Sequence, residues 1–142
     1  VDATAADNDS LLAVELATFL QWLLSGNTDL ALLGFAPSAD MERLRRRAGL
    51  SNESPPDVSI VDLQALAVHA GCGSLGQVPS LRKVVETWLP GHTLDKKEQC
   101  SDWGHRPLAA SQIAYASLDA IVLLELWQQM VSSASGASHN GR

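Results

Sequence analysis

The sequence has 142 residues, of which 46% are hydrophobic and 18% charged, and its formal net charge is -6 at pH 7. This composition excludes a disordered chain, and with only two cysteines and no apolar run near the ~20 residues of a membrane span, one intracellular globular domain is expected. The acidic balance argues against nucleic-acid binding through a broad basic face, but a site that meets phosphates through metal ions must itself be acidic.

The first third of the chain alternates helix, strand and helix. The predicted elements are a helix over residues 8–27, a buried strand within 29–37 and a helix over 38–50. Apolar residues recur at helical spacing in the first helix, and Asp9 or Ser10 is expected to cap it. Pro37 ends the short apolar run of the strand, and Ser38 is expected to cap the helix that follows.

The rest of the chain continues this alternation toward a long helix. The predicted segments are a loop over 51–57, a strand and a helix within 58–71, a helix over 80–90, an irregular stretch over 91–107 and a helix over about 109–133. Asp62 marks the change from strand to helix, and Ser80 and Pro90 bound the next helix. The domain is expected to occupy residues 1–131, with a disordered tail at 132–142. Strands that alternate with helices predict an α/β fold with parallel strands.

The long helix carries two polar side chains inside an almost unbroken apolar run. Tyr115 and Asp119 are four residues apart, so they lie side by side on one helical face. A helix that is apolar almost all round is normally buried, and an unpaired buried carboxylate is costly. Two interpretations remain open at this point. In the first, Tyr115 and Asp119 are surface residues, or Asp119 accepts a hydrogen bond from a buried backbone donor. In the second, Asp119 binds a cation, and the phenol orients a water molecule bound to that cation.

The stretch that leads into this helix carries an ordered series of short motifs. They are Leu94-Asp95-Lys96, Ser101-Asp102-Trp103, Arg106-Pro107-Leu108, and Tyr115 with Asp119. This series resembles the end of the ribonuclease D and Werner-type 3′–5′ exonuclease domain. Upstream, LLGFAPSADMERL resembles the second motif of the family, with Asp40 as its carboxylate. The resemblance covers about residues 10–131 and implies a DEDDy-type domain with a ribonuclease H-like α/β fold. Such a fold has a mixed sheet flanked by helices, and helix is expected to dominate here because N-terminal strands are missing.

The resemblance implies hydrolysis of nucleotides from the single-stranded 3′ end of a nucleic acid with two divalent ions, Mg²⁺ or Mn²⁺. Hard cations prefer carboxylate oxygens, so Asp119 is expected as a direct ligand and Asp40 as a ligand, directly or through water. Tyr115 is expected to position the attacking water. The candidate contacts with nucleic acid are Lys96, Lys97, Arg106 and Trp103.

One part of the family pattern is missing. The first motif, an Asp-x-Glu on the opening strand, supplies the other two carboxylates, but Asp2 is followed two residues later by Thr4. The residues VDATAADN are also too few for the strands that precede the first helix in the family. The chain is therefore expected to be an inactive part of an exonuclease domain. The alternative is a catalytically dead relative that binds RNA or a protein partner.

Several smaller signals have two interpretations. The arginines within 43–47 are either a solvated basic face or a nucleic-acid contact, and Trp103 either anchors the core or stacks on a base. A zinc site is disfavoured because no Cys-x-x-Cys pair occurs among His69, Cys72, Cys100 and His105. Ala109 stands where the family has a Ser or Thr helix cap, a loss of roughly 1 kcal/mol unless Ser111 caps one turn later.

Overall fold

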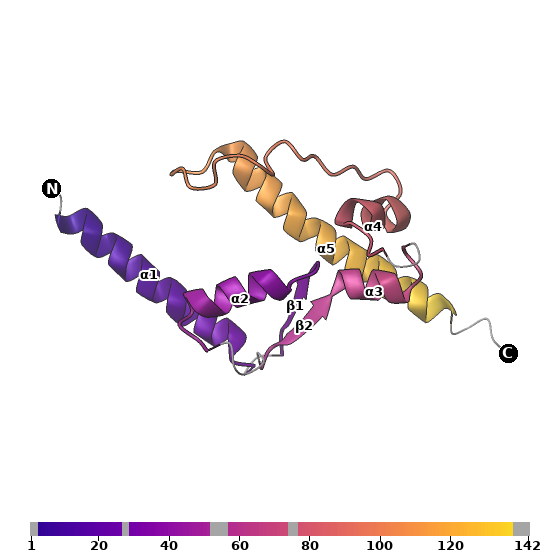
Figure 1. The fold of residues 1–142 in the computed structure, drawn as a ribbon, viewed down its shortest axis with the longest axis horizontal. Helices are drawn as coiled ribbons and strands as arrows, with labels where there is room; N and C mark the ends of the chain where they lie inside the picture. Colours follow the sequence, from indigo (N-terminus) through magenta and orange to yellow (C-terminus); the bar gives the residue numbers. More distant parts are fainter. Residues whose placement is uncertain (1–2, 27–28, 52–56, 74–76, 138–142) are drawn as a thin grey trace. The chain divides into compact units, whose positions relative to one another are not determined.

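The computed structural model describes residues 3–26, 29–51, 57–73 and 77–137 (Figure 1). Within these residues, five helices and two strands follow one another in the order α1-β1-α2-β2-α3-α4-α5. The chain divides into two compact units, Val1–Val61 and Asp62–Arg142. Helix dominates the described residues, as the sequence predicts. None of the described helices is long and apolar enough to cross a membrane.

The described part of the first unit combines two helices with a small parallel sheet. Its elements are α1 (Ala3–Leu24), β1 (Ala31–Gly34), α2 (Ser38–Arg47) and β2 (Ser59–Asp62). β1 and β2 are paired, and α2 is the crossover between them that a parallel pair requires. The predicted strand–helix–strand order is therefore confirmed. β1 is half-buried rather than fully buried, because β2 is its one neighbour in the described sheet.

α1 begins at Ala3, so Asp9 and Ser10 lie inside the helix and do not cap it. The predicted start was wrong because the alanine-rich residues before Asp9 have high helix propensity and extend the helix. The core of this unit is built from the buried side chains of Leu20, Leu24, Met41, Ala48 and Val58. Among the side chains of α1 whose burial is described, those of the last turns, Leu20 and Leu24, reach this core. The exposed apolar side chains of α1 include Leu11, Leu12, Val14, Leu16, Phe19 and Trp22.

Pro37, and not the predicted Ser38, occupies the N-cap position of α2. Ser38 is the first helical residue, and no side-chain hydrogen bond caps this end. The amide of Met41 donates the first helical hydrogen bond to the carbonyl of Pro37 at 2.8 Å. Proline is tolerated at a helix start because its missing N–H has no helical partner there in any case.

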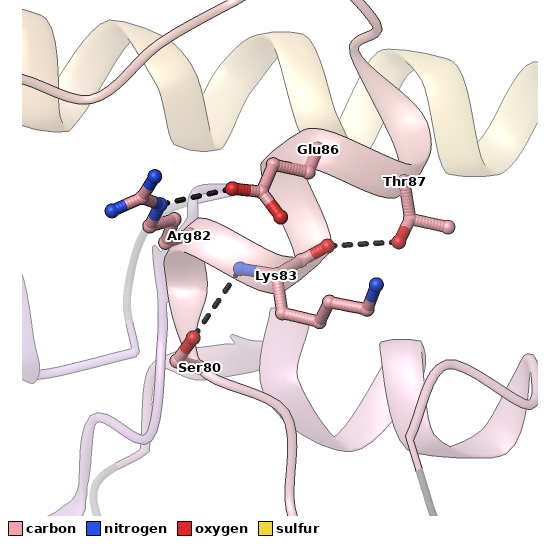
Figure 2. A network of polar contacts seen from close by, with 5 residues as sticks. All are labelled: Ser80, Arg82, Lys83, Glu86 and Thr87. Atoms are coloured by element: carbon pink, nitrogen blue, oxygen red, sulfur yellow. Dashed lines mark hydrogen bonds and ion pairs between the residues drawn. The ribbon is translucent and has the colours of Figure 1, made fainter.

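The described part of the second unit is helical, with α3 (Leu63–His69), α4 (Leu81–Trp88) and α5 (Ala110–Ala137). The Asp62 carboxylate caps α3 by accepting hydrogen bonds from the amides of Gln64 and Ala65 at 2.9 and 3.4 Å. The Ser80 hydroxyl caps α4 by accepting a hydrogen bond from the Lys83 amide at 3.3 Å (Figure 2). The Ser80 cap confirms the sequence prediction, and the start of α3 at Leu63 confirms that the chain changes from strand to helix near Asp62.

α4 has an exposed polar side and a buried apolar side. Arg82 and Glu86 pair one turn apart at 2.9 Å (Figure 2), and their side chains are 65% and 48% exposed. Such a pair stabilises a helix by only about 0.2–0.5 kcal/mol. The fully buried residues of α4 are Val84 and Val85. Burial of these valines, more than the ion pair, therefore holds α4 in the unit, where it contacts α3 and α5.

α5 continues to Ala137, so the prediction of a disordered tail at 132–142 was wrong for residues 132–137. Two serine hydroxyls donate to carbonyls one turn back, from Ser133 to Gln129 at 2.9 Å and from Ser135 to Val131 at 3.0 Å. These bonds satisfy the hydroxyls within a helical backbone, so a serine-rich sequence does not end the helix here. Residues 138–142 lie outside the described residues.

One stripe of α5 is buried, and much of its other apolar surface is exposed. Val122, Leu126 and Met130 recur every four residues and form the buried stripe of a helix that contacts α3 and α4. The exposed side chains include Ile113, Leu118, Ile121 and Leu124, each between 47% and 61% exposed. The expectation that this apolar helix is buried was therefore wrong for these residues, because α3 and α4 cover only part of the helix.

Candidate active site

Tyr115 and Asp119 lie one turn apart on α5, and both are half-buried. They line a cleft with a volume of about 570 Å³. The other wall of this cleft is formed by residues 92–95, 97 and 98, which belong to the stretch predicted to be irregular. The spacing of a phenol and a carboxylate on one helical face, seen in the sequence, therefore corresponds to a shared cleft within the second unit.

Acidic side chains outnumber basic ones around the cleft. Its charged or titratable lining residues, apart from Tyr115, are Asp95, Glu98, Asp119, Glu125, Lys97 and His92. The Lys97 ammonium lies 3.7 Å from the Asp95 carboxylate, and His92 Nε2 lies 3.5 Å from a Glu125 oxygen. In the described part of the chain, no ion pair involves Asp119. The Glu98 carboxylate likewise has no ion pair among the described residues, so Asp119 is distinguished by its position one turn from Tyr115.

The phenol of Tyr115 keeps its proton well above neutral pH. Burial raises the pKa of Tyr115 above its ordinary value of 10.0, and the charge of Asp119 and a hydrogen bond with it raise this pKa further. Cys100 and Asp95 add smaller effects in the same direction. A neutral phenol has one proton to donate and lone pairs to accept with. Because the phenol donates its proton to Asp119, its lone pairs remain to accept a hydrogen bond within the cleft.

Trp103 lies beside Tyr115. Their ring centroids are 6.0 Å apart and their planes are inclined by 53°. The indole N–H of Trp103 donates to the carbonyl of Glu98 at 3.0 Å, and the residue is half-buried. Trp103 therefore supports the phenol from the segment before α5. Its predicted stacking on a nucleic-acid base stays a prediction.

The three basic residues predicted to contact nucleic acid differ in their positions. Lys97 lines the cleft, while Lys96 is exposed and is not part of the lining. Arg106 is also exposed, and its Nη1 donates to the carbonyls of Trp103 and His105 at 2.9 and 2.8 Å. Arg106 therefore stabilises its own turn, and Lys97 is the best placed of the three for a phosphate in the cleft.

Asp40 lies in the first turn of α2, in the first unit. Its side chain is 69% exposed, and its carboxylate is 3.2 Å from the guanidinium of Arg43. An exposed pair of this kind is weak and exchanges readily with solvent. The convergence of Asp40 with Asp119 that the resemblance implies stays a prediction.

The arginines that follow Asp40 do not form a uniform basic face. Arg43 and Arg46 each pair with an acidic residue of the same helix, and Arg47 is exposed. Arg45, in contrast, is buried and donates to the carbonyl of Ser51. It follows the buried Met41 by four residues, so it lies on the inner side of α2. A solvated basic face therefore describes the other three arginines but not Arg45.

The ligand chemistry of the cleft suits a hard divalent cation, because its anionic groups are carboxylates. Among the described residues, however, no group of three or more His, Cys, Asp or Glu side chains is placed to share one ion. The role of Asp119 as a metal ligand therefore stays a prediction. The zinc alternative likewise has no cluster in the described part of the chain.

Gln112 is a contributor to this region that sequence reasoning missed. It is only 5% exposed, and its Oε1 accepts a hydrogen bond from the Ala109 amide at 2.9 Å. Three residues after the cap is where a capping box places Glu or Gln, so the position of Gln112 after Ala109 was the available signal. α5 thus keeps half of a capping box although Ala109 has no capping side chain. The roles of Asp95 and Glu98 as lining residues were missed as well, because the path of their segment along α5 is not a local property of the sequence.

Comparisons with known proteins place this geometry in a family. A sequence model of the 3′–5′ exonuclease family matches residues 6–134. The exonuclease mut-7 homolog of Aedes aegypti is 34% identical over 110 residues, which cover 70% of this chain and 15% of that protein. A ribonuclease D from Shewanella sp. is 33% identical over 128 residues, which cover 89% of this chain and 30% of that protein. The chain therefore spans less than a third of either relative.

A solved structure supports the same conclusion about the fold. The EXO domain of Nibbler from Aedes aegypti matches with a TM-score of 0.70 and 27% sequence identity. The match covers 88% of this chain and 62% of that one. The predicted ribonuclease H-like α/β fold is thereby confirmed.

Proposed function

The chain belongs to the 3′–5′ exonuclease family as a DEDDy-type domain, and on this premise we propose that it is part of a nuclease that removes nucleotides from a single-stranded 3′ end. The observation that carries this proposal is the pair of Tyr115 and Asp119 in an acidic cleft, at the position of the Tyr-x-x-x-Asp of the family. A carboxylate without an ion pair and a protonated phenol on one wall suit an ion and a water molecule held against a phosphate.

We assign Asp119 as a direct ligand of Mg²⁺ or Mn²⁺, and Asp40 as a second ligand, directly or through water. Both residues offer hard oxygen donors, which these cations prefer over nitrogen or sulfur. When bound, two such ions activate the attacking water and stabilise the leaving 3′ oxygen. Asp40 and Asp119 would supply two of the four carboxylates that the family uses.

Tyr115 is assigned to positioning the attacking water. Its raised pKa keeps the phenol neutral, so the group adds direction to the site without adding a second negative charge beside Asp119. This matters because the cleft must admit a phosphate, and each further negative charge there would repel it. Loss of the hydroxyl is therefore expected to lower the rate of the chemical step more than the affinity for the strand.

The approach of the nucleic-acid backbone is assigned mainly to Lys97. It lines the cleft and is held near Asp95 at 3.7 Å, a loose ion pair that a phosphate can replace. Lys96, Arg106 and Trp103 are kept as outer contacts to the strand, which fits their positions outside the lining of the cleft. Binding through such contacts should weaken as salt rises.

The chain as it stands is proposed to be inactive. Asp119 and Asp40 leave the ligand set short of the pair from the opening-strand motif, and electrostatic stabilisation by the bound ions is a large part of catalysis in such sites. The alternative is a catalytically dead relative that keeps the fold and binds RNA or a protein partner. The two proposals differ in whether the parent protein carries an Asp-x-Glu on an opening strand.

The deciding experiment follows release of nucleotides from a 3′-labelled single strand, RNA or DNA, in the presence of Mn²⁺. It compares the 142-residue chain, a protein extended upstream by its native sequence, and the Asp119→Asn variant of the extended protein. We expect the extended protein to release nucleotides and the 142-residue chain to release none. The Asp119→Asn variant of the extended protein should release them about 10²-fold more slowly, or slower still. Glu86→Gln, which alters an exposed acid of α4, is the matched control and should retain activity.

Two results would contradict the proposal. Asp119-dependent release by the 142-residue chain alone would show that the first motif has been misplaced. An extended protein that carries an Asp-x-Glu strand but releases nothing, while still binding the labelled strand, would favour the dead relative.

A further inference from the structure

We propose that Gln112 is a positioning residue for Tyr115, which acts by holding residues 101–103 against α5 so that Trp103 fixes the phenol. This inference rests on the proposed role of Tyr115 in the exonuclease site. Gln112 is not assigned any contact with substrate or metal. Its effect is transmitted through the segment that it binds.

The carboxamide of Gln112 is fully engaged as a donor. Its Nε2 donates to Ser101 Oγ at 3.1 Å and to the Asp102 carbonyl at 3.0 Å, while its Oε1 accepts from the Ala109 amide at 2.9 Å. If the amide of Gln112 were flipped, its N–H groups would face the N–H of Ala109, and its carbonyl oxygen would face the carbonyl of Asp102. The partners therefore fix one orientation of the side chain. Because Gln112 is only 5% exposed, water cannot easily replace these partners.

The segment that Gln112 binds is itself held together by one carbonyl. The Glu98 carbonyl accepts hydrogen bonds from the Ser101 amide and hydroxyl at 3.1 and 2.9 Å. It also accepts the indole N–H of Trp103 at 3.0 Å. Ser101 and Trp103 are therefore fixed relative to each other, so a shift of Ser101 moves the indole with it.

The indole in turn contacts the phenol. The inclined arrangement of Trp103 and Tyr115, with centroids 6.0 Å apart, is a favourable geometry for an aromatic pair. Gln112 and Tyr115 are three residues apart on α5, so they lie on neighbouring positions of one face. Gln112 holds the backbone of the segment, and Trp103 of the same segment meets the ring.

Gln112 is the main link in this arrangement. Among the described residues, the hydrogen bonds that join residues 101–103 to α5 are those of Gln112. The two hydrogen bonds that the Arg106 side chain donates go to carbonyls of its own turn, so they do not join that turn to α5. Without Gln112, the ring contact alone would have to keep the segment in place, and a single aromatic contact is a weak restraint.

Tyr115 is the only tyrosine in the sequence, so ¹³C-labelled tyrosine gives one ring signal set that reports its surroundings at neutral pH. The ring current of Trp103 shifts these signals in the parent chain. We expect Gln112→Ala to move them most of the way to their positions in a Trp103→Leu variant. The matched control is Gln64→Ala, which removes a half-buried amide that donates to the Pro79 carbonyl at 2.9 Å and should leave the signals in place.

A double variant tests whether Gln112 acts through Trp103. The combined Gln112→Ala and Trp103→Leu change should shift the signals no further than Trp103→Leu alone, because both remove the same restraint. Unchanged signals in Gln112→Ala, or additive shifts in the double variant, would overturn the proposal. If Gln112→Ala does not fold, Ser101→Ala is the substitute, because it removes one of the two acceptors of Gln112. This variant must shift the tyrosine signals in the same direction by a smaller amount. Unchanged signals in Ser101→Ala would also overturn the proposal.

Kinetics of the extended, active protein separate this inference from the proposed function. Gln112→Ala should lower kcat about 10-fold or more with little change in KM, since misplacement of a positioning group affects the chemical step. It should cause no further loss in a Tyr115→Phe background. If Tyr115→Phe leaves kcat intact, the assigned role of Tyr115 fails. If Tyr115→Phe lowers kcat and Gln112→Ala does not, the inference about Gln112 fails alone.

Discussion

Asp40 and Asp119 are assigned to one metal site, yet the structure surrounds the two carboxylates in different ways. Asp119 is half-buried in a cleft, beside a phenol and without an ion pair in the described residues. Asp40 is 69% exposed on the first turn of α2 and is paired with Arg43. The second unit thus builds the environment of its carboxylate by itself, whereas the first unit supplies a carboxylate whose environment is mostly solvent.

This difference follows from what supports each side chain. Asp119 lies on a helix whose buried stripe packs within the second unit, and a hydrogen-bonded segment covers the same part of α5. Asp40 lies on a short helix with its inner side in a small core and its outer side free. Changes to the second unit should therefore alter the chemistry of its carboxylate, while changes around Asp40 should have small, local effects.

The largest expected effect comes from the buried stripe beneath Asp119. Leu126 is 0% exposed, so Leu126→Ala should lower the free energy of unfolding by about 2–5 kcal/mol, from lost burial and the cavity left behind. Leu124→Ala, the same change at a 54% exposed position of the same helix, is the control and should cost less than about 1 kcal/mol. Urea unfolding followed by circular dichroism measures both. Equal losses would show that α5 has no buried side that matters for stability.

The next prediction concerns the protonation of Tyr115. Asp119→Asn removes the negative charge that raises the pKa of the phenol, so this pKa should fall toward its ordinary value of 10.0. The absorbance of tyrosinate follows it directly, with circular dichroism of the same samples as a check that the chain stays folded. Asp40→Asn should give a smaller fall if the two carboxylates converge. No change with Asp40→Asn would contradict their convergence.

The same shift makes stability depend on pH in a defined range. Because the folded-state pKa of Tyr115 lies above 10.0, its contribution is fully present below pH 10.0 and is lost as pH rises through the folded-state pKa. Asp119→Asn brings the folded-state pKa of Tyr115 closer to its unfolded-state pKa. The loss of stability that Tyr115 causes at alkaline pH should therefore become smaller. A variant that loses stability above pH 10.0 as steeply as the parent would point to another group.

Several local features of the second unit were predictable from the sequence. Ser80 caps α4 as expected, because a cap needs only a side-chain oxygen and the next few amides, and the change from strand to helix near Asp62 was also predicted. The spacing of Tyr115 and Asp119 on one face follows in the same way from helical geometry. These predictions succeeded because each depends on residues less than two turns apart.

The features that failed depend on partners far along the chain. The exposure of Leu118 and Leu124 was not predictable, since an apolar helix looks buried whether or not another element covers it. The position of residues 92–98 along α5, and hence the cleft itself, depends on an irregular path that no periodicity describes. Helix ends failed for a subtler reason: alternatives to a side-chain cap, such as the Pro37 start of α2, satisfy the backbone equally well.

Metal binding is expected to shift the stability of the chain only slightly. The site would have Asp119 and at most one further carboxylate, so binding should be weak. At a millimolar concentration near the dissociation constant, Mn²⁺ should raise the free energy of unfolding by about 0.4 kcal/mol and Tm by about 1–2 °C. Asp119→Asn should abolish this rise. A rise of the same size in Asp119→Asn would show that the ion binds elsewhere.

The smallest effect tests whether Asp40 belongs to the site at all. Its carboxylate pairs with Arg43 at 3.2 Å, and both side chains are largely exposed, so the pair contributes no more than about 0.5 kcal/mol. A cation that binds Asp40 must compete with Arg43 for the same oxygen and tolerate its positive charge. Arg43→Ala should therefore raise the affinity for Mn²⁺ about twofold, as measured from the free Mn²⁺ signal in electron paramagnetic resonance.

Arg46→Ala is the matched control for this last change, because Arg46 pairs with Glu42 on the same helix at 2.7 Å and leaves Asp40 untouched. It removes the same charge at a greater distance from Asp40, where solvent and salt screen it. Its effect on Mn²⁺ affinity should therefore be clearly smaller than that of Arg43→Ala. Equal effects of the two variants would mean that only net charge matters, and Asp40 would then be a surface residue of α2 with no part in binding the ion.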